Sequence, residues 1–201
     1  MIAQTDDRES AATTFGVEKL LAWQQNSGGW GFGPGHSHTE RYPAFADLGN
    51  TQLAVAALRR ARAAGIPVAD SVFESAATFA LACQNADGGF GLTPVETESI
   101  RFRGASHGSA TTGALAVLIT DQTLRNVATS PDSTLKGIQW MTTHYTPAGE
   151  EEWVWGDQTR ELVTYAWRLM DFAEVSHFGQ FDSSTIRDDV VAMLLAEINE
   201  D

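Results

Sequence analysis

Three polar residues have the type and the spacing for chemistry at one end of a helical domain: Asp47, His107 and Asp157. Asp47 and His107 are separated by the period of an internal repeat, and each of the three stands at the start of a segment expected to be helical. Helix N-termini favour anions such as a diphosphate, which His107 could bond. The aspartates would repel an anion unless they held a metal ion, and they could instead act as general acid or base. The alternative is structural: both aspartates are helix N-caps and His107 is a loop residue.

The elements that position these residues form the internal repeat. The Gly-Gly-aromatic-Gly turn at 28–31 returns at 88–91, and the Ala-rich segment at 50–58 returns at 110–118, which is the same offset. A third, degraded copy covers 135–144 and 164–169 and lacks the Gly-Gly-aromatic turn. Two separated blocks that share one offset predict a unit of helix, glycine-rich turn and helix.

Apolar spacing throughout the chain is helical, and no segment alternates as a strand would, so the sequence predicts an all-α protein. The expected helices cover 11–25, 47–64, 70–84, 107–127, 133–145, 157–175 and 183–199. We expect a single domain over 1–201, with repeats at about 11–64, 70–127 and 133–175 and a last helix at about 183–199. The second helix of each repeat is rich in Ala, Gly and Thr, which allows the close helix approach of an inner ring.

Composition excludes several classes of protein. The 201 residues are 43% apolar and 19% charged, which excludes an intrinsically disordered chain. A net charge of −13 excludes a general binder of nucleic acid or of anionic membranes. Cys83 is the only cysteine, so the chain has no intrachain disulfide and no cysteine-rich metal site. No apolar run is long enough to span a bilayer and no apolar leader opens the sequence, so we expect a soluble, cytoplasmic protein.

The large aromatic residues gather in or near the expected loops. Such rings could line an apolar cavity, where their faces stabilise a cation. Trp30 and Phe90, which follow the paired glycines, could equally be structural clamps of the repeat. The candidate substrate-binding residues are Trp30, Tyr42, Phe102, Trp153, Trp155 and Tyr165.

The motif Gln-Asn-x-x-Gly-Gly-aromatic-Gly, with Gln84 before Phe90 and Gln25 before Trp30, resembles the prenyltransferase and squalene oxidase repeat. Squalene–hopene cyclases, oxidosqualene cyclases and the β subunits of protein prenyltransferases share this repeat. The likeness covers most of the chain, and it implies an (α/α) barrel, or toroid, of inner and outer helices that handles isoprenoids. Ser106-His107-Gly108 resembles the Ala-His-Gly of the prenyltransferases, in which the histidine helps to hold a lipid diphosphate.

Departures from the family pattern limit this expectation. The Asp-x-Asp-Asp motif of the cyclases is absent, and Asp157-Gln158-Thr159 stands where the prenyltransferases have a zinc-binding Asp-x-Cys pair. Zinc is therefore not expected, whereas magnesium would accompany a diphosphate substrate. A closed barrel has more helices than the seven expected here, so we expect an incomplete toroid, with a homodimer or larger assembly as a way to complete it.

The first functional hypothesis is an isoprenoid-binding or isoprenoid-converting protein, in which Asp47, His107 and Asp157 are catalytic or contact the diphosphate. As an enzyme it would be a transferase or isomerase related to terpene cyclases and prenyltransferases. The alternative is a non-catalytic helical-repeat module that binds a protein or peptide. A third hypothesis, a sugar-active barrel, would need Asp47 and Asp157 as opposed carboxylates. The sequence leaves open whether the chain is an enzyme.

Overall fold

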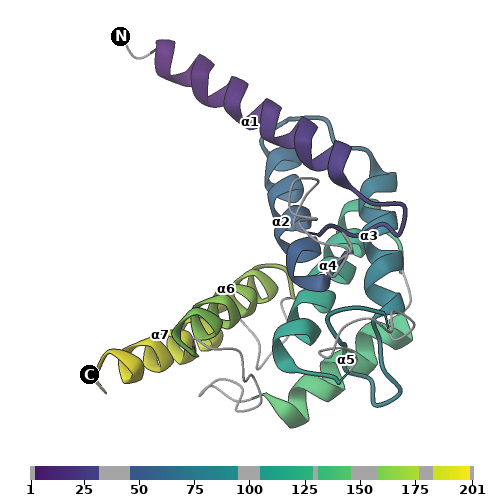
Figure 1. Ribbon diagram of the computed structural model, residues 1–201, viewed down its shortest axis with the longest axis vertical. Coiled ribbons are helices and arrows are strands. Elements are labelled where there is room, and N and C mark those ends of the chain that lie inside the picture. Colours follow the sequence, from purple (N-terminus) through teal and green to yellow (C-terminus); the bar gives the residue numbers. More distant parts are fainter. Residues whose placement is uncertain are drawn as a thin grey trace, which may run out of the picture.

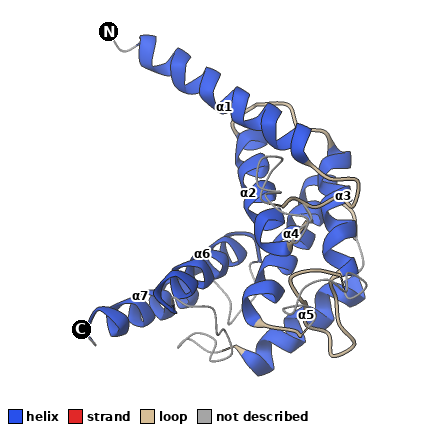
Figure 2. Ribbon diagram, viewed as in Figure 1, coloured by secondary structure: helices blue, strands red, loops and turns tan. Residues whose placement is uncertain are grey.

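A computed structural model describes residues 3–31, 46–94, 105–128, 131–145, 158–176 and 183–199. Within these segments every regular element is a helix, which confirms the all-α class (Figure 2). The seven helices are α1 (Ala3–Trp23), α2 (Leu48–Ala63), α3 (Asp70–Ala82), α4 (Gly108–Arg125), α5 (Pro131–His144), α6 (Gln158–Ser176) and α7 (Ser183–Asn199). Only α1 differs clearly from its expected bounds, because it begins at Ala3 rather than near residue 11. None of the described helices has the length and apolarity that a bilayer crossing requires.

The helices lie in two layers. The even-numbered helices contact one another in the order α2, α4, α6, and the odd-numbered helices pack against them: α1 on α2, α3 and α5 on α4, and α7 on α6. Figure 1 shows a curved molecule, with α1 at one end and α6 and α7 at the other. The first and last helices therefore lie far apart.

Helix α4 is the centre of the packing. Every residue from Gly108 to Asp121 is buried, although the helix holds few large apolar side chains. Its Ala, Gly, Ser and Thr residues have small side chains, so α2, α3, α5 and α6 can all approach its backbone closely. One apolar cluster lies between α1, α2, α3 and α4, and a second joins α4 to α5, α6 and α7.

A glutamine at each glycine turn ties one repeat to the next. The Gln24 side-chain amide donates to a carbonyl of its own turn and, at 2.9 Å, to the Val72 carbonyl of α3. Gln84 does the same in the second repeat and reaches the Ser133 carbonyl of α5 at 2.9 Å. The expected pairing of Gln25 with Trp30 is wrong by one position, because Gln24 is the equivalent of Gln84. Gln25 instead exchanges backbone hydrogen bonds within the turn.

The two turns need glycine for the same reason. Gly28 and Gly88 have φ angles of 92° and 94°, which side chains rarely adopt. A Cβ on Gly28 would also overlap the Ser75 carbonyl of α3, and one on Gly88 would lie 3.1 Å from the Lys136 carbonyl of α5. The odd-numbered helix that follows each turn, α3 or α5, therefore has its backbone in close contact with that turn.

Helix α5 occupies the third repeat's outer position, one place later than the offset of the first two repeats predicts. The second glycine of the first turn faces Phe79 of α3, and the second glycine of the next turn faces Trp140 of α5. The number of residues from Phe79 to Trp140 equals the number from Val72 to Ser133. Both separations are one residue longer than the separation of the two glycine turns. The degraded third copy therefore keeps its outer-helix contacts.

Candidate functional site

Asp47 and His107 cap α2 and α4 in the same manner. The Asp47 carboxylate accepts hydrogen bonds from the backbone amide of Asn50 at 2.8 Å and from its side-chain amide at 2.6 Å. The Nδ1 atom of His107 accepts from the Ala110 amide at 3.2 Å. Both side chains thus satisfy free amides in the first turn of a helix, which is the N-cap role.

Trp30 is held as part of the repeat. The residue is 3% exposed, and its indole Nε1 donates to the Leu20 carbonyl of α1 at 2.7 Å. Its backbone amide donates to the Thr51 hydroxyl of α2 at 3.0 Å, and Phe90 and Thr111 repeat this bond at 3.0 Å. These contacts fix each turn against the second helix of its own repeat.

Of the remaining aromatic and catalytic candidates, the described segments include only Tyr165. Tyr165 lies on α6, 4% exposed, within the second apolar cluster. The other candidates lie outside the described residues: Tyr42, Phe102, Trp153, Trp155 and Asp157.

Arg168 of α6, which the sequence did not single out, reaches the beginnings of α2 and α4. Its Nη1 donates to the Ser109 hydroxyl at 2.8 Å, and its other terminal nitrogen lies against Gly49, where any Cβ would overlap it. Gly49 and Ser109 are counterparts in the first two repeats, so one guanidinium contacts equivalent positions of both. The Asp47 carboxylate borders the same space.

The charge of Asp47 compensates for an unfavourable placement of this arginine. A cation at helix N-termini is opposed by both helix dipoles, and Arg168 is only 9% exposed. Burial raises the pKa of Asp47, and the hydrogen bonds from Asn50 and the charge of Arg168 partly oppose that rise. The carboxylate and the guanidinium therefore stabilise each other's charged forms.

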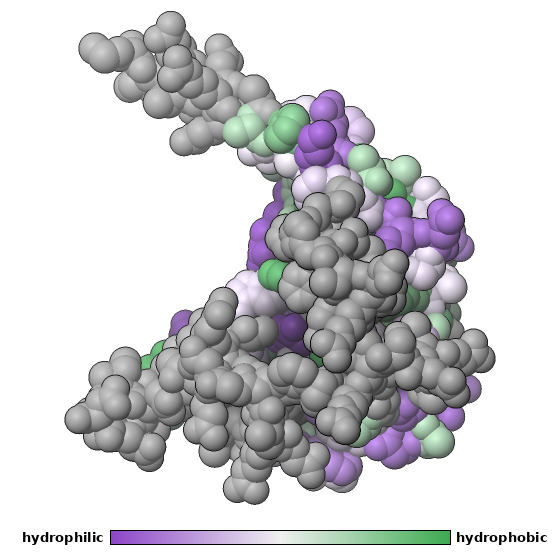
Figure 3. All heavy atoms as spheres, viewed as in Figure 1, coloured by the Kyte–Doolittle hydropathy of each residue, from purple (hydrophilic) through white to green (hydrophobic). Residues whose placement is uncertain are grey.

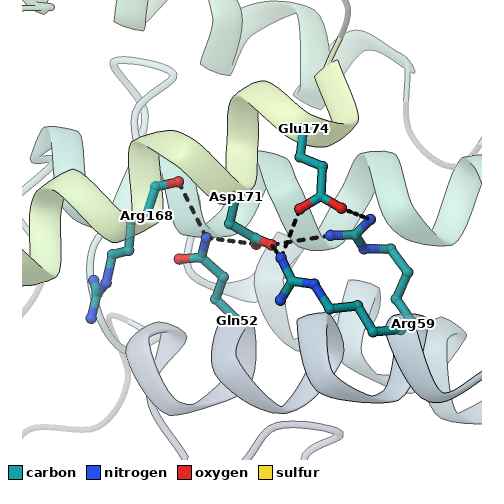
Figure 4. Close-up of polar contacts among 6 residues, drawn as sticks. Gln52, Arg59, Arg168, Asp171 and Glu174 are labelled. Atoms are coloured by element: carbon teal, nitrogen blue, oxygen red, sulfur yellow. Dashed lines mark hydrogen bonds and ion pairs between the residues drawn. The ribbon is translucent and has the colours of Figure 1, made fainter. Parts of the chain in front are cut away.

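A second polar network joins α2 to α6, as Figure 4 shows. The Asp171 carboxylate, 4% exposed, accepts from the Gln52 amide at 3.0 Å and from Arg59 at 3.2 Å. Glu174, one turn further along α6, pairs with Arg59 at 3.1 Å and with Arg60 at 2.7 Å. Among the described side chains, charged and amide groups hold these two helices together.

The spacing on α6 was the signal that could have identified this network. Arg168, Asp171 and Glu174 follow one another at every third position, which places them on one helix face. Most of the other residues between Tyr165 and Val175 are apolar, and a charged face on such a helix segment indicates polar partners on a neighbouring element. Their identity on α2, which is distant in the sequence, required the structure.

The chemical capacity of this region is limited by its hydrogen bonds. The Nδ1 atom of His107 is already used as the acceptor that caps α4. In the described part of the chain, no three His, Cys, Asp or Glu side chains come together as metal ligands would.

Comparison of the sequence with protein-family models gives no match, and neither do comparisons with curated proteins and with solved structures. The resemblance to the prenyltransferase and squalene oxidase repeat therefore stays a prediction.

Proposed function

We propose that this chain is a non-catalytic helical-repeat module, built as part of an (α/α) toroid, that binds a protein or peptide partner. The observation that carries the proposal is the equivalent capping by Asp47 and His107. A catalytic pair needs two different, available groups, whereas these side chains fill one repeated structural position and use their acceptors to hold helices.

The arrangement of the helices supports the same proposal. Stacked hairpins expose extended surfaces, which repeat proteins use to bind partners. Phe15, Trp23 and Leu53 are 60%, 44% and 51% exposed, on α1 and α2. Large apolar side chains left exposed on two helices in contact are typical of an interaction surface.

Site-specific photo-crosslinking in the source cells tests this function. A photoreactive residue would replace Leu53 on α2, Leu135 on α5 or Val191 on α7, all of which are exposed. We expect a discrete protein adduct from at least one position, unchanged by His107→Asn, which keeps a cap. No protein adduct from any of the three positions would refute the proposal.

Arg168 supports a second candidate function, the binding or conversion of an isoprenoid diphosphate. Its guanidinium lies at the N-terminal ends of α2 and α4, where an anionic group would meet both helix dipoles and an arginine. Magnesium would accompany such a ligand.

Thermal shift with farnesyl and geranylgeranyl diphosphate, with and without magnesium, tests this candidate. A ligand at 100 times its Kd stabilises the folded chain by about 2.7 kcal/mol. The shift should disappear in Arg168→Gln. An unchanged melting temperature with every diphosphate would refute the candidate and leave the binding module standing.

A further inference from the structure

Each outer helix presents one face to the glycine turn that precedes it. In α3 this face includes Ser75 and Phe79, and in α5 it includes Lys136 and Trp140. The offset between the first two repeats assigns the corresponding face of α1 to Ala12, Phe15, Gly16, Lys19 and Trp23.

The corresponding face of α1 is uncovered. Phe15 is 60% exposed and Trp23 is 44% exposed, although Cys83, the C-cap residue of α3 and the counterpart of Trp23, is fully buried. A Cβ on Gly16 would meet nothing within 4 Å. On α5, a Cβ on the equivalent Gly137 would lie 2.9 Å from the Phe90 ring of the preceding turn region.

Helix α2 has an uncovered face of the same kind. A Cβ on Gly113 of α4 would lie 2.9 Å from the side-chain oxygen of Gln52, so this face of α4 is covered by α2. Leu53 is the counterpart of Gly113 in α2 and is 51% exposed. Ala57, one turn later, is also exposed, whereas its counterpart Val117 is 1% exposed.

The interior of the chain shows what covers this type of surface. The glycine turn that follows α1 covers the face of α3, and helix α2 covers the face of α4. We propose that the open edge, defined as Phe15, Lys19 and Trp23 of α1 with Leu53 and Ala57 of α2, docks a helix–glycine turn–helix segment of a partner protein. This inference rests on the proposed binding function and names its surface.

Lys19 indicates the charge of the partner's turn. It takes the place of Phe79 in α3 and of Trp140 in α5. In the second turn Asp87 accepts a hydrogen bond from the Trp140 indole at 3.1 Å. A lysine at this place can pair with a carboxylate at the position of Asp87, so the partner has an acidic glycine turn.

The shape of the molecule leaves room for such a segment. Figure 3 shows that the molecule is concave on the side between α1 and the end that holds α6 and α7, and Figure 1 shows α2 along this side. In Figure 3 hydrophobic atoms are visible where α1 joins the rest of the molecule, next to hydrophilic ones. A hairpin seated there would contact α1 and α2 together.

A polypeptide of residues 70–127 of this chain can serve as the probe for the open edge. It contains helix α3, the glycine turn with Asp87 and helix α4. Fluorescence anisotropy of the labelled polypeptide with the full chain should give saturable binding. Leu53→Glu and Lys19→Glu should each weaken it at least tenfold. Leu135→Glu, on α5 and 54% exposed, is the matched control and should leave binding unchanged.

A charge exchange tests the assigned contact directly. An Asp87→Lys polypeptide should bind the unaltered chain weakly and recover its affinity with the Lys19→Glu chain. The same polypeptide joined ahead of the full chain by a flexible linker should raise the urea midpoint, and Leu53→Glu should cancel the rise. This covalent form keeps the test decisive if the free polypeptide does not fold alone.

Several results would overturn the inference. One is the absence of saturable polypeptide binding together with an unchanged urea midpoint of the linked chain. Another is polypeptide binding that Leu53→Glu and Leu135→Glu weaken equally. A dimer of the chain alone that Leu53→Glu abolishes in sedimentation would make a second copy the occupant instead. Crosslinked adducts at Leu135 or Val191 but not at Leu53 would overturn this surface and leave the binding function intact.

Discussion

The pairing of α6 with α2 makes a sharp prediction about two carboxylates that share the same arginines. Asp171 and Glu174 both bind Arg59, and the bonds of Glu174 are at least as short: 2.7 Å to Arg60 against 3.0 Å from Gln52 to Asp171. The side chain of Asp171 is 4% exposed, whereas that of Glu174 is 48% exposed. If burial decides the energy, the two residues should differ greatly in their effect on stability.

Asp171→Asn should cost about 3 kcal/mol of unfolding free energy, because it removes the buried carboxylate that Arg59 and Gln52 both bind. The new amide would also turn its NH2 group toward either Arg59 or the Gln52 amide, and both of these are donors. Glu174→Gln should cost less than about 1 kcal/mol, since water screens an exposed pair. The distances alone would predict the opposite order.

Urea unfolding followed by circular dichroism at pH 7 measures both effects. With a slope of about 2 kcal/mol per molar urea, Asp171→Asn should lower the midpoint by about 1.5 M and Glu174→Gln by less than about 0.5 M. Arg59→Met should add little in the Asp171→Asn background, because the two residues act as one unit. Equal shifts for the two single variants would refute the reasoning from burial.

The remaining predictions concern a cap, a turn, a carboxylate and a thiol. His107→Ala should cost about 1 kcal/mol and His107→Asn much less, measured by urea unfolding, because asparagine also caps helices. Gly28→Ala should cost more than about 3 kcal/mol, whereas Gly65→Ala, at a φ of 89° but in open space, should cost about 1 kcal/mol. Burial opposes a low pKa for Asp87, but its hydrogen bonds outweigh burial and lower the pKa. The stability that the ionised Asp87 contributes is therefore present above the ordinary Asp pKa and is lost as the pH falls through the lower pKa of the folded state. Asp87→Asn should make the melting temperature decline less steeply in acid. Cys83 is fully buried with a raised thiol pKa, so a thiol reagent should label it only at the rate of unfolding.

Much of the fold could be predicted from the sequence because its signals are local. Helical spacing of apolar residues located all seven helices, and the returning Gly-Gly-aromatic turn located the repeat. The third copy was harder, because its contacts with Gly89 come from Trp140 of α5, one position out of register with Phe79 of α3. A comparison of the sequence with itself at one fixed offset cannot detect that shift. The structure shows it, because an aromatic ring packs on the second glycine of both turns.

The candidate site was predicted only in part. The sequence aligned Asp47 with His107 correctly, and capping is a local property that the structural interpretation of the aspartates had included. Arg168 was missed because it acts across the fold: its guanidinium fits only where Gly49 leaves space beside Asp47. Such a fit depends on how α6 crosses α2 and α4, which no spacing within one helix specifies.

The uncovered face of α1 is unlike the end of a stack of repeats. Terminal repeats keep a stack soluble by presenting a polar outer face. Phe15 and Trp23 of α1 are the counterparts of Ser75 in α3 and of Cys83, the C-cap residue of α3. The side chains of α1 are therefore larger and more apolar, although they are more exposed. The exposed parts of these two rings contribute no hydrophobic stabilisation to the isolated chain, because the hydrophobic effect acts only on surface removed from water. Lys19 lies over the Phe15 ring at 5.1 Å, and an exposed cation–π contact of this kind adds only about 0.5 kcal/mol. Replacing them by Ser and Cys should therefore cost no more than about 2 kcal/mol of unfolding free energy, from the parts of the rings that are buried, while abolishing the binding of the acidic-turn hairpin. A much larger loss of stability would show instead that the rings stabilise the fold.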